Sequence, residues 1–321
     1  MRAATWGRTR LPVSRIAFGT WQLGGDWGVF AEDEAKAAIR RARELGVNIF
    51  DTARANGFGA SERLLGSALR DELRWNRDEL VIATKGGLRR TDTGVARDAG
   101  PRVLREGVDA SLTALGVDLY QVHWADPKAQ FADTAGALKE LVASGKIRHV
   151  GVSNFSAEQM ASFSRTLPVE TVQPSYHLFR REIEDTVLPH TRRQDIGVLV
   201  YGPLAHGLLT GTLTEDTTLP ADDWRSKSGV FKGETYRRNL AVVRELERFA
   251  AARAMTISQL AISWTLAHPD VDVAIVGTRH ADQVEDSLAA ADITLGETDL
   301  KEIDSIMAAA TPVAGPSLES T

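Results

Sequence analysis

The stretch Phe50-Asp51-Thr52-Ala53-Arg54-Ala55-Asn56-Gly57-Phe58-Gly59-Ala60-Ser61-Glu62 decides how this chain folds. It follows the apolar run 47–50, which predicts a buried strand, and it leads into residues 61–69, whose apolar positions recur at helical spacing. Ser61 stands where a helix N-cap is expected. The stretch therefore predicts a strand, a glycine-containing loop and a helix, with Asp51 at the carboxyl end of the strand.

This strand–loop–helix unit recurs along the chain. Eight short apolar runs predict strands, and longer segments with helical periodicity separate them. Eight strands alternating with helices predict an α/β fold in which a parallel sheet closes into a (β/α)8 TIM barrel. A doubly wound sheet is the alternative, but residues 19–25 lack the glycine spacing of a dinucleotide-binding fingerprint. The expected strands are 16–18, 47–50, 80–84, 119–122, 150–152, 171–173, 198–200 and 273–276.

Helical patterns fill the segments between these strands. No composition break, repeat or low-complexity linker divides the chain, so we expect one domain over residues 1–321 with a core at about 14–310. Residues 1–13 predict a small hairpin that turns at Gly7-Arg8 and plugs one barrel end. The expected helices are 31–45, 61–69, 101–115, 131–144, 156–167, 183–194, 237–252, 258–267 and 281–289.

Polar residues and one glycine follow the predicted strands at, or just past, their carboxyl ends. In a parallel barrel these ends meet on one face, where active sites are built from the loops. Side chains spread over the whole sequence can therefore converge, and we expect an active site at this face. The residues are Asp51, Lys85, His123, Ser153, Asn154, Gln173, Tyr201 and Gly277.

Composition limits the possible functions. Of 321 residues, 43% are hydrophobic and 25% charged, which is typical of a globular protein with a large core, and the net charge of −5 argues against a nucleic-acid partner. The chain has no cysteine, which excludes disulfides. We expect a cytoplasmic protein with no membrane partner, because no apolar run reaches 18 residues. The histidines have no metal-ligand spacing, so no metal is expected.

Together with Ala83-Thr84-Lys85 and Val122-His123-Trp124, the opening stretch resembles the signature of the aldo-keto reductases. The resemblance covers about residues 16–290 and is greatest to bacterial members near the stress-protein and potassium-channel β-subunit branch. It implies an oxidoreductase acting on CH–OH groups, with an Asp, Tyr, Lys and His tetrad. Asp51, Lys85 and His123 match three members, and Asn56 stands where the family has Tyr.

Chemistry explains why these residue types occur together. Carbonyl reduction by a nicotinamide needs a proton on oxygen, and an ammonium held by a carboxylate helps a tyrosine release one, while a histidine polarises the carbonyl. A carboxamide cannot supply that proton. We therefore expect a slow reductase, with His123 or water as a poor substitute donor. Asn56 is either an introduced inactivating change or natural divergence. The plainer alternative is that Asp51 and Lys85 form only a structural ion pair and that His123 is a core histidine.

The resemblance also implies a site for NADP(H). It places the nicotinamide against the strand-end residues, the pyrophosphate under the Tyr201–Gly211 loop, and a ribose 2′-phosphate at Arg279. Asp286 and Ser287 depart from the family's usual Glu and Asn near adenine. The expected cofactor residues are Thr20, Trp21, Asp51, Ser153, Asn154, Gln173, Tyr201, Gly202, Leu204, Gly207, Leu209, Gly277, Thr278, Arg279, Gln283, Asp286 and Ser287.

An aromatic wall around a few polar groups predicts a small carbonyl or alcohol as the substrate. The expected substrate residues are Trp21, Trp27, Arg54, Phe58, Trp124 and Trp224, and residues 222–233 have the composition of a mobile lid. Two other functions stay open: a regulatory protein that binds NADP(H) with little turnover, which the loss of Tyr at 56 favours, and a non-redox barrel enzyme. The latter leaves Ser153-Asn154 and Arg279 unexplained.

Overall fold

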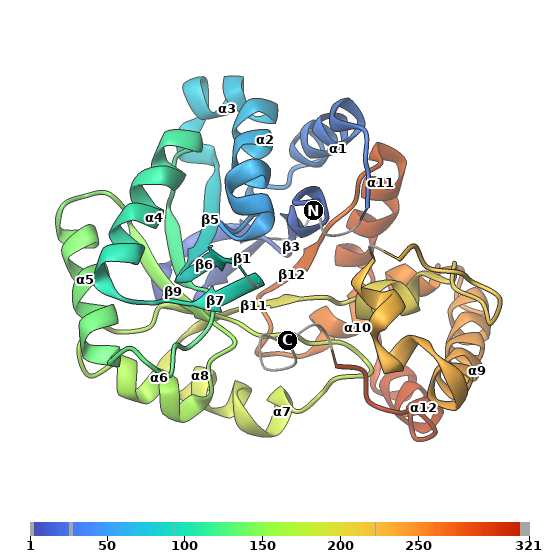
Figure 1. Ribbon diagram of the computed structural model, residues 1–321. Coiled ribbons are helices and arrows are strands. Elements are labelled where there is room, and N and C mark those ends of the chain that lie inside the picture. Colours follow the sequence, from blue (N-terminus) through green and yellow to red (C-terminus); the bar gives the residue numbers. More distant parts are fainter. Residues whose placement is uncertain (1–2, 26–27, 93, 222, 315–321) are drawn as a thin grey trace.

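Eight parallel strands close into a barrel at the centre of the molecule, and helices surround it (Figure 1). The computed structural model describes residues 3–25, 28–92, 94–221 and 223–314. Around the ring, β4 stands opposite β10 and β5 stands opposite β11. The fold class and all eight predicted strands are confirmed. In ring order the strands are β3 (Ile16–Gly19), β4 (Ile49–Asp51), β5 (Val81–Gly86), β8 (Leu119–Val122), β9 (His149–Ser153), β10 (Thr171–Gln173), β11 (Gly197–Tyr201) and β12 (Val273–Val276).

The barrel strands are buried on both faces, as parallel strands covered by helices must be. The helices present one apolar stripe to them: the first buries Ala35, Ala38, Ile39 and Ala42, which are three or four positions apart. The helices are α1 (Glu32–Glu44), α2 (Ala60–Ala68), α3 (Arg70–Trp75), α4 (Pro101–Ala114), α5 (Phe131–Ala143), α6 (Ala157–Phe163), α7 (Ile183–Thr186), α8 (Leu188–Gln194), α9 (Gly233–Ala251), α10 (Ile257–Ala267), α11 (Ala281–Ala289) and α12 (Glu297–Met307).

The N-terminal hairpin closes one end of the barrel, as predicted. Strands β1 (Ala3–Trp6) and β2 (Leu11–Ser14) pair antiparallel, joined by a 3-10 turn over Gly7–Thr9. The Trp6 ring is fully buried and lies against the start of β11, where a side chain on Gly197 would overlap it. The cavity described below lies at the other face.

Several elements differ from the prediction. A second hairpin, β6 (Leu88–Thr91) with β7 (Gly94–Arg97), follows β5 and was not expected, nor were α3 and α12. The segment 183–194 forms two short helices instead of one, and Pro189 lies in the first turn of the second, where its missing N–H costs least. Within the described residues, no helix is long and apolar enough to cross a membrane.

Ser61 is not an N-cap. Gly59 precedes α2 in a left-handed conformation, and Ser61 lies one residue inside the helix, fully buried. Its hydroxyl donates to the carbonyl oxygen of Thr20 at 3.0 Å. A serine that joins two loops looks the same in sequence as one that caps a helix. Ser156, by contrast, caps α6 with a complete capping box to Gln159.

Candidate active site

One cavity of about 850 Å³ occupies the carboxyl-terminal face of the barrel. Its lining includes every strand-end residue named in the sequence analysis, together with Asn56. The expected convergence at this face is therefore observed. The lining continues from the ends of β4, β5 and β8 to the segment after β12 and into α11, where Ser287 is its last residue in sequence.

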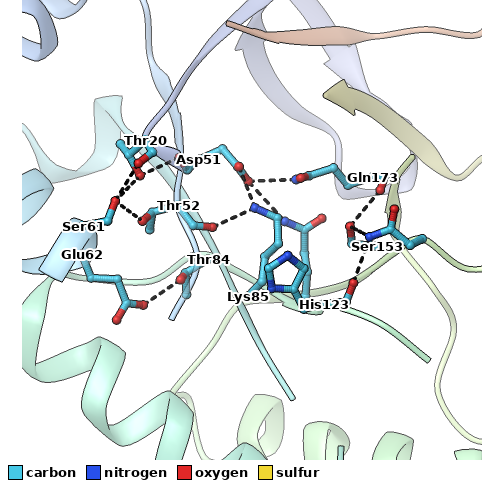
Figure 2. Close-up of polar contacts among 12 residues, drawn as sticks. Thr20, Asp51, Thr52, Ser61, Glu62, Thr84, Lys85, His123, Ser153 and Gln173 are labelled. Carbon is cyan, nitrogen blue, oxygen red and sulfur yellow. Dashed lines mark hydrogen bonds and ion pairs between the residues drawn. The ribbon is translucent and has the colours of Figure 1, made fainter. Parts of the chain in front are cut away.

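Asp51 and Lys85 form a buried ion pair at the centre of this lining (Figure 2). Lys85 Nζ donates to Asp51 Oδ2 at 2.7 Å and to the carbonyl oxygen of Thr52 at 2.8 Å. Each side chain is almost completely shielded from solvent, with 5% of each residue exposed. Two charges out of water need this direct contact and further hydrogen bonds, because burial alone penalises each of them. The ammonium is thus fixed in position and faces the cavity.

The second carboxylate oxygen of Asp51 is held from across the barrel. Gln173 Nε2 donates to Asp51 Oδ1 at 2.9 Å, from the strand opposite β4. Ser153 Oγ in turn donates to the carbonyl oxygen of Gln173 at 2.9 Å, and Tyr201 OH donates to Asn154 Oδ1 at 3.0 Å. These side chains form a connected polar floor, which explains how residues from five strand ends keep one geometry.

His123 lies beside this floor and remains neutral. Burial, and then the nearby Lys85 charge, lower the pKa of His123 to about 3. Its Nδ1 is buried without a hydrogen-bond partner among the described residues. A neutral imidazole can polarise an oxygen by donating a hydrogen bond, but at neutral pH it is not an imidazolium with a proton to release.

Asn56 also lines the cavity, at the position where the resemblance expects a phenol. It is buried, with 7% of the residue exposed, and begins a 3-10 turn, Asn56–Gly59, that leads into α2. Its backbone N–H donates to the carbonyl oxygen of Ala53 at 3.0 Å. Side chains at 51, 56, 85 and 123 thus share one cavity wall, and only the residue type at 56 departs from the expected set.

A second set of polar side chains packs behind the residues that line the cavity. Ser61 Oγ lies 2.7 Å from Thr20 Oγ1 and 3.3 Å from Thr52 Oγ1. Glu62 is fully buried, and its Oε1 accepts from Thr84 Oγ1 at 2.7 Å (Figure 2). This layer fixes the residues that follow Asp51 and precede Lys85, so it sets the distance between the acid and the amine.

Comparisons with known proteins agree with this geometry. Residues 15–308 match the profile of the "Aldo/keto reductase family". The chain is 40% identical over 304 residues to the aldo-keto reductase YhdN of Bacillus subtilis, covering 93% of this chain and 91% of the relative. It is 31% identical over 318 residues to the NADH-specific methylglyoxal reductase of Escherichia coli, covering 93% and 96%.

The chain belongs to the aldo/keto reductase family. A solved structure, the glycerol dehydrogenase of Gluconobacter oxydans, superposes with a TM-score of 0.87 at 36% identity, and the match covers 99% of this chain and 98% of that one. Members of this family reduce carbonyl compounds with nicotinamide cofactors, so the cavity is the expected place for both.

Most residues expected to hold the cofactor of an aldo/keto reductase line the cavity. Thr20 and Leu209 do not: the first supports Asp51 from below, and the second is fully buried in the hydrophobic core. Near the end of the lining, Thr278 Oγ1 donates to Gln283 Oε1 at 2.6 Å. Asp286 accepts from Gln259 Nε2 at 2.9 Å, which uses part of its capacity within the protein.

The expected substrate residues divide into two groups. Trp21 and Trp124 line the cavity, whereas Arg54, Phe58 and Trp224 do not. Arg54 turns toward Glu62, Phe58 lies under the guanidinium of Arg90, and Trp224 packs edge-on against His206. Trp27 lies outside the described residues. The expected lid contains two 3-10 turns, Trp224–Lys227 and Gly229–Phe231, and its mobility stays a prediction.

The lining also includes residues that were not expected from sequence, and four of them have side chains that bear on the chemistry of the cavity. Leu88 and Val95 belong to the hairpin β6–β7, and His206 and Arg225 lie beyond β11. Arg225 donates to both the Asp223 carboxylate, at 2.6 Å, and the carbonyl oxygen of His206, at 3.0 Å. Arg225 lies in the 3-10 turn Trp224–Lys227, far beyond the end of β11, so no strand-end position in the sequence marked it as a lining residue.

Proposed function

We propose that this aldo/keto reductase is an NADP(H)-dependent reductase of aldehydes or ketones, slowed by Asn56. The observation that carries the proposal is the buried Asp51–Lys85 pair beside neutral His123, in the wall of one cavity. A structural ion pair alone would not need an imidazole and a chain of amides and hydroxyls directed at the same space.

The cavity suits a dinucleotide in both size and chemistry. Its 850 Å³ lie in the range of ligand pockets, and its lining joins the polar floor to two arginines, Arg225 and Arg279. Guanidinium groups match phosphate oxygens, and Arg279 stands where a 2′-phosphate is expected. A relative that is NADH-specific shares the fold, so the choice of NADP(H) rests on Arg279.

The roles of the protein side chains follow from their environment. When bound, a nicotinamide supplies the hydride. Lys85, held by Asp51, places a positive charge next to the oxygen that becomes an alkoxide, and His123 donates a hydrogen bond to it. Asn56 can donate a hydrogen bond as well, but it holds no proton that it can release at neutral pH. The final proton therefore comes from water, which makes the reaction slow.

The test compares the protein with Asn56→Tyr and Asn56→Phe. Binding of NADPH and NADH is followed by quenching of tryptophan fluorescence, and turnover is followed with a panel of aldehydes and ketones. We expect all three proteins to bind cofactor and only the Tyr variant to gain rate, by about 10²–10⁴-fold, the usual contribution of a general acid. The Phe variant fills the same space without an acid and is the matched control.

Two outcomes would contradict this proposal. Equal rates for the Tyr and Phe variants would exclude the missing phenol as the cause of slow turnover. Cofactor binding by the Tyr variant without any turnover would instead favour the second candidate, a protein that binds NADP(H) for regulation. Asn56 is the observation that favours that candidate, and the intact Asp51–Lys85 pair with His123 counts against it.

A further inference from the structure

The unexpected hairpin β6–β7 presents one of its faces to the active-site cavity. In its antiparallel register Leu88 pairs with Arg97, and Arg90 pairs with Val95. Side chains of paired residues lie on the same face of such a hairpin, so all four share one face. Because Leu88 and Val95 line the cavity, Arg90 and Arg97 stand on the same side of the hairpin. Neither arginine is itself part of the lining, and Arg90 is exposed at its edge.

Both arginines are held above aromatic rings. The Cζ atom of Arg90 lies 4.6 Å from the centroid of the Phe58 ring, and that of Arg97 lies 5.2 Å from the centroid of Trp124. Trp124 is itself part of the cavity wall. Stacking on a ring fixes the plane of a guanidinium and leaves its edge available for hydrogen bonds. Arg97 uses this edge within the protein, where Nη1 donates to the carbonyl oxygen of Ala125 at 3.2 Å. This gives the cavity mouth a positive charge of defined position.

The Arg90 guanidinium is not paired with a carboxylate of the described residues. Among the described residues, no carboxylate oxygen lies within 4.0 Å of Arg90, and no hydrogen bond uses its donors. Its neighbour Arg89 points to the opposite face and lies 3.0 Å from Asp98. Two adjacent arginines thus have different surroundings, and the one toward the cavity retains five unused donors.

Arg90 is far from the two arginines that we propose as contacts of the cofactor phosphates. The hairpin follows β5, whereas Arg225 follows β11, the strand on the opposite side of the ring. Arg279 follows β12, three strands away from β5. A ligand group beside Arg90 is therefore contributed by the other reactant, the carbonyl compound.

We propose that Arg90 binds an oxyanion, a carboxylate or a phosphate, at the far end of the carbonyl substrate. This inference rests on the proposed function and narrows its substrate class to anionic aldehydes and ketones. Arg90 is a specificity-determining residue in this view, and the hydrophobic side chains of Leu88 and Val95 contact the carbon chain between the carbonyl and the anion.

The experiment pairs charged and neutral probes of similar size: 4-carboxybenzaldehyde with benzaldehyde, and glyceraldehyde 3-phosphate with glyceraldehyde. We expect kcat/KM to favour each anion by about 10-fold to 100-fold at low salt, the range for charge-assisted hydrogen bonds, and the preference to fall with ionic strength. Comparing the two pairs distinguishes a carboxylate from a phosphate. In Arg90→Gln the preference for the anion should disappear because KM for the charged substrate rises. Arg90→Lys should keep part of the preference.

The matched control is Arg89→Gln, which removes the same charge from the opposite face of the hairpin. Its anion preference should equal that of the unaltered protein. Equal preference in Arg90→Gln and Arg89→Gln, or no preference in any protein, would overturn the inference. The melting temperature of each variant tests whether the substitution in the hairpin leaves the fold intact.

A binding measurement separates this inference from the proposed reductase function. Calorimetric titration of 4-carboxybenzyl alcohol and benzyl alcohol into the cofactor-saturated protein needs no turnover. Preferential binding of the carboxylate, lost in Arg90→Gln, supports the anion site even if no aldehyde is reduced. Reduction of both aldehydes with equal binding of both alcohols supports the reductase and refutes the anion site.

Discussion

Arg54 Nη1 lies 3.5 Å from Oε2 of Glu62, a carboxylate with no solvent exposure. The other oxygen of Glu62 accepts from the hydroxyls of Thr84 and Ser111, both at 2.7 Å. The loop that carries Asn56 is thereby fixed to β5 and to α4 through one buried acid. Arg54 thus helps to position the loop that carries Asn56, and it does not line the cavity.

Gly59 makes room for this contact, so Gly59→Ala should damage the loop. Its φ of +96° is unfavourable for alanine, and the added Cβ would overlap Nη1 of Arg54. The control is Gly46→Ala, since Gly46 has a φ of +93° and nothing within 4 Å of an added Cβ. Urea unfolding should show a loss of about 1 kcal/mol for the control and at least about 1–2 kcal/mol more for Gly59→Ala. Equal losses would mean that Arg54 moves aside without cost.

The Asp51–Lys85 pair should show strong coupling in a double-mutant cycle on stability. Asp51→Asn or Lys85→Met alone leaves one buried charge without its partner, at a cost of about 3–5 kcal/mol. The double variant should lose clearly less than the sum of the two single losses. Denaturant unfolding of the four proteins measures this, and simple additivity would show that the two groups do not interact in solution.

Arg279→Ala should weaken NADPH binding by about 10-fold or more and leave NADH binding unchanged, because only NADPH carries the 2′-phosphate. Arg279→Lys keeps the charge without the bidentate fork and should lie between the two. Direct titration of both nucleotides gives the affinity ratio. A ratio that does not change in Arg279→Ala would remove the basis for preferring NADP(H).

Acid should destabilise the protein through its buried histidines. Burial lowers the pKa of His206 to about 3 and also lowers that of His177, whose two ring nitrogens have no partner among the described residues. The unfolded chain, with histidine pKa values near 6.5, binds more protons below that pH. Stability is therefore full above about pH 6.5 and falls as the pH drops toward 3, by up to about 1.4 kcal/mol per pH unit for each histidine.

His177→Leu removes one of these groups. Its free energy of unfolding should fall less steeply than that of the unaltered protein between pH 6.5 and pH 5, as measured by urea midpoints at each pH. Parallel pH profiles for the two proteins would show that His177 is not held neutral by the fold.

Sequence reasoning succeeded where periodicity and strand ends carry the information. The eight barrel strands are short runs buried on both faces, and their carboxyl ends must meet, so the convergence of Asp51, Lys85 and His123 followed from topology alone. Ser153, Asn154 and Gln173 lie in the same floor for the same reason.

The hairpin β6–β7 was missed because it has no apolar alternation of its own. Its strands are four residues each, rich in arginine and largely exposed. The place of Arg54 was missed for a related reason. Arg54 contacts Glu62 because that glutamate is buried. The local pattern of charges in the sequence does not show that Glu62 is buried.

The hydrogen bond from Gln173 to Asp51 joins residues 122 positions apart, on strands that face each other across the ring. The acid, the amine and the imidazole all come from the first four strands, β3 to β8, and the amide partner from the last four, β9 to β12. Neither half-barrel holds a finished pocket by itself. We therefore expect nucleotide binding to appear during refolding only when the two halves of the barrel have docked. Two halves that are expressed separately should bind nucleotide only after they associate.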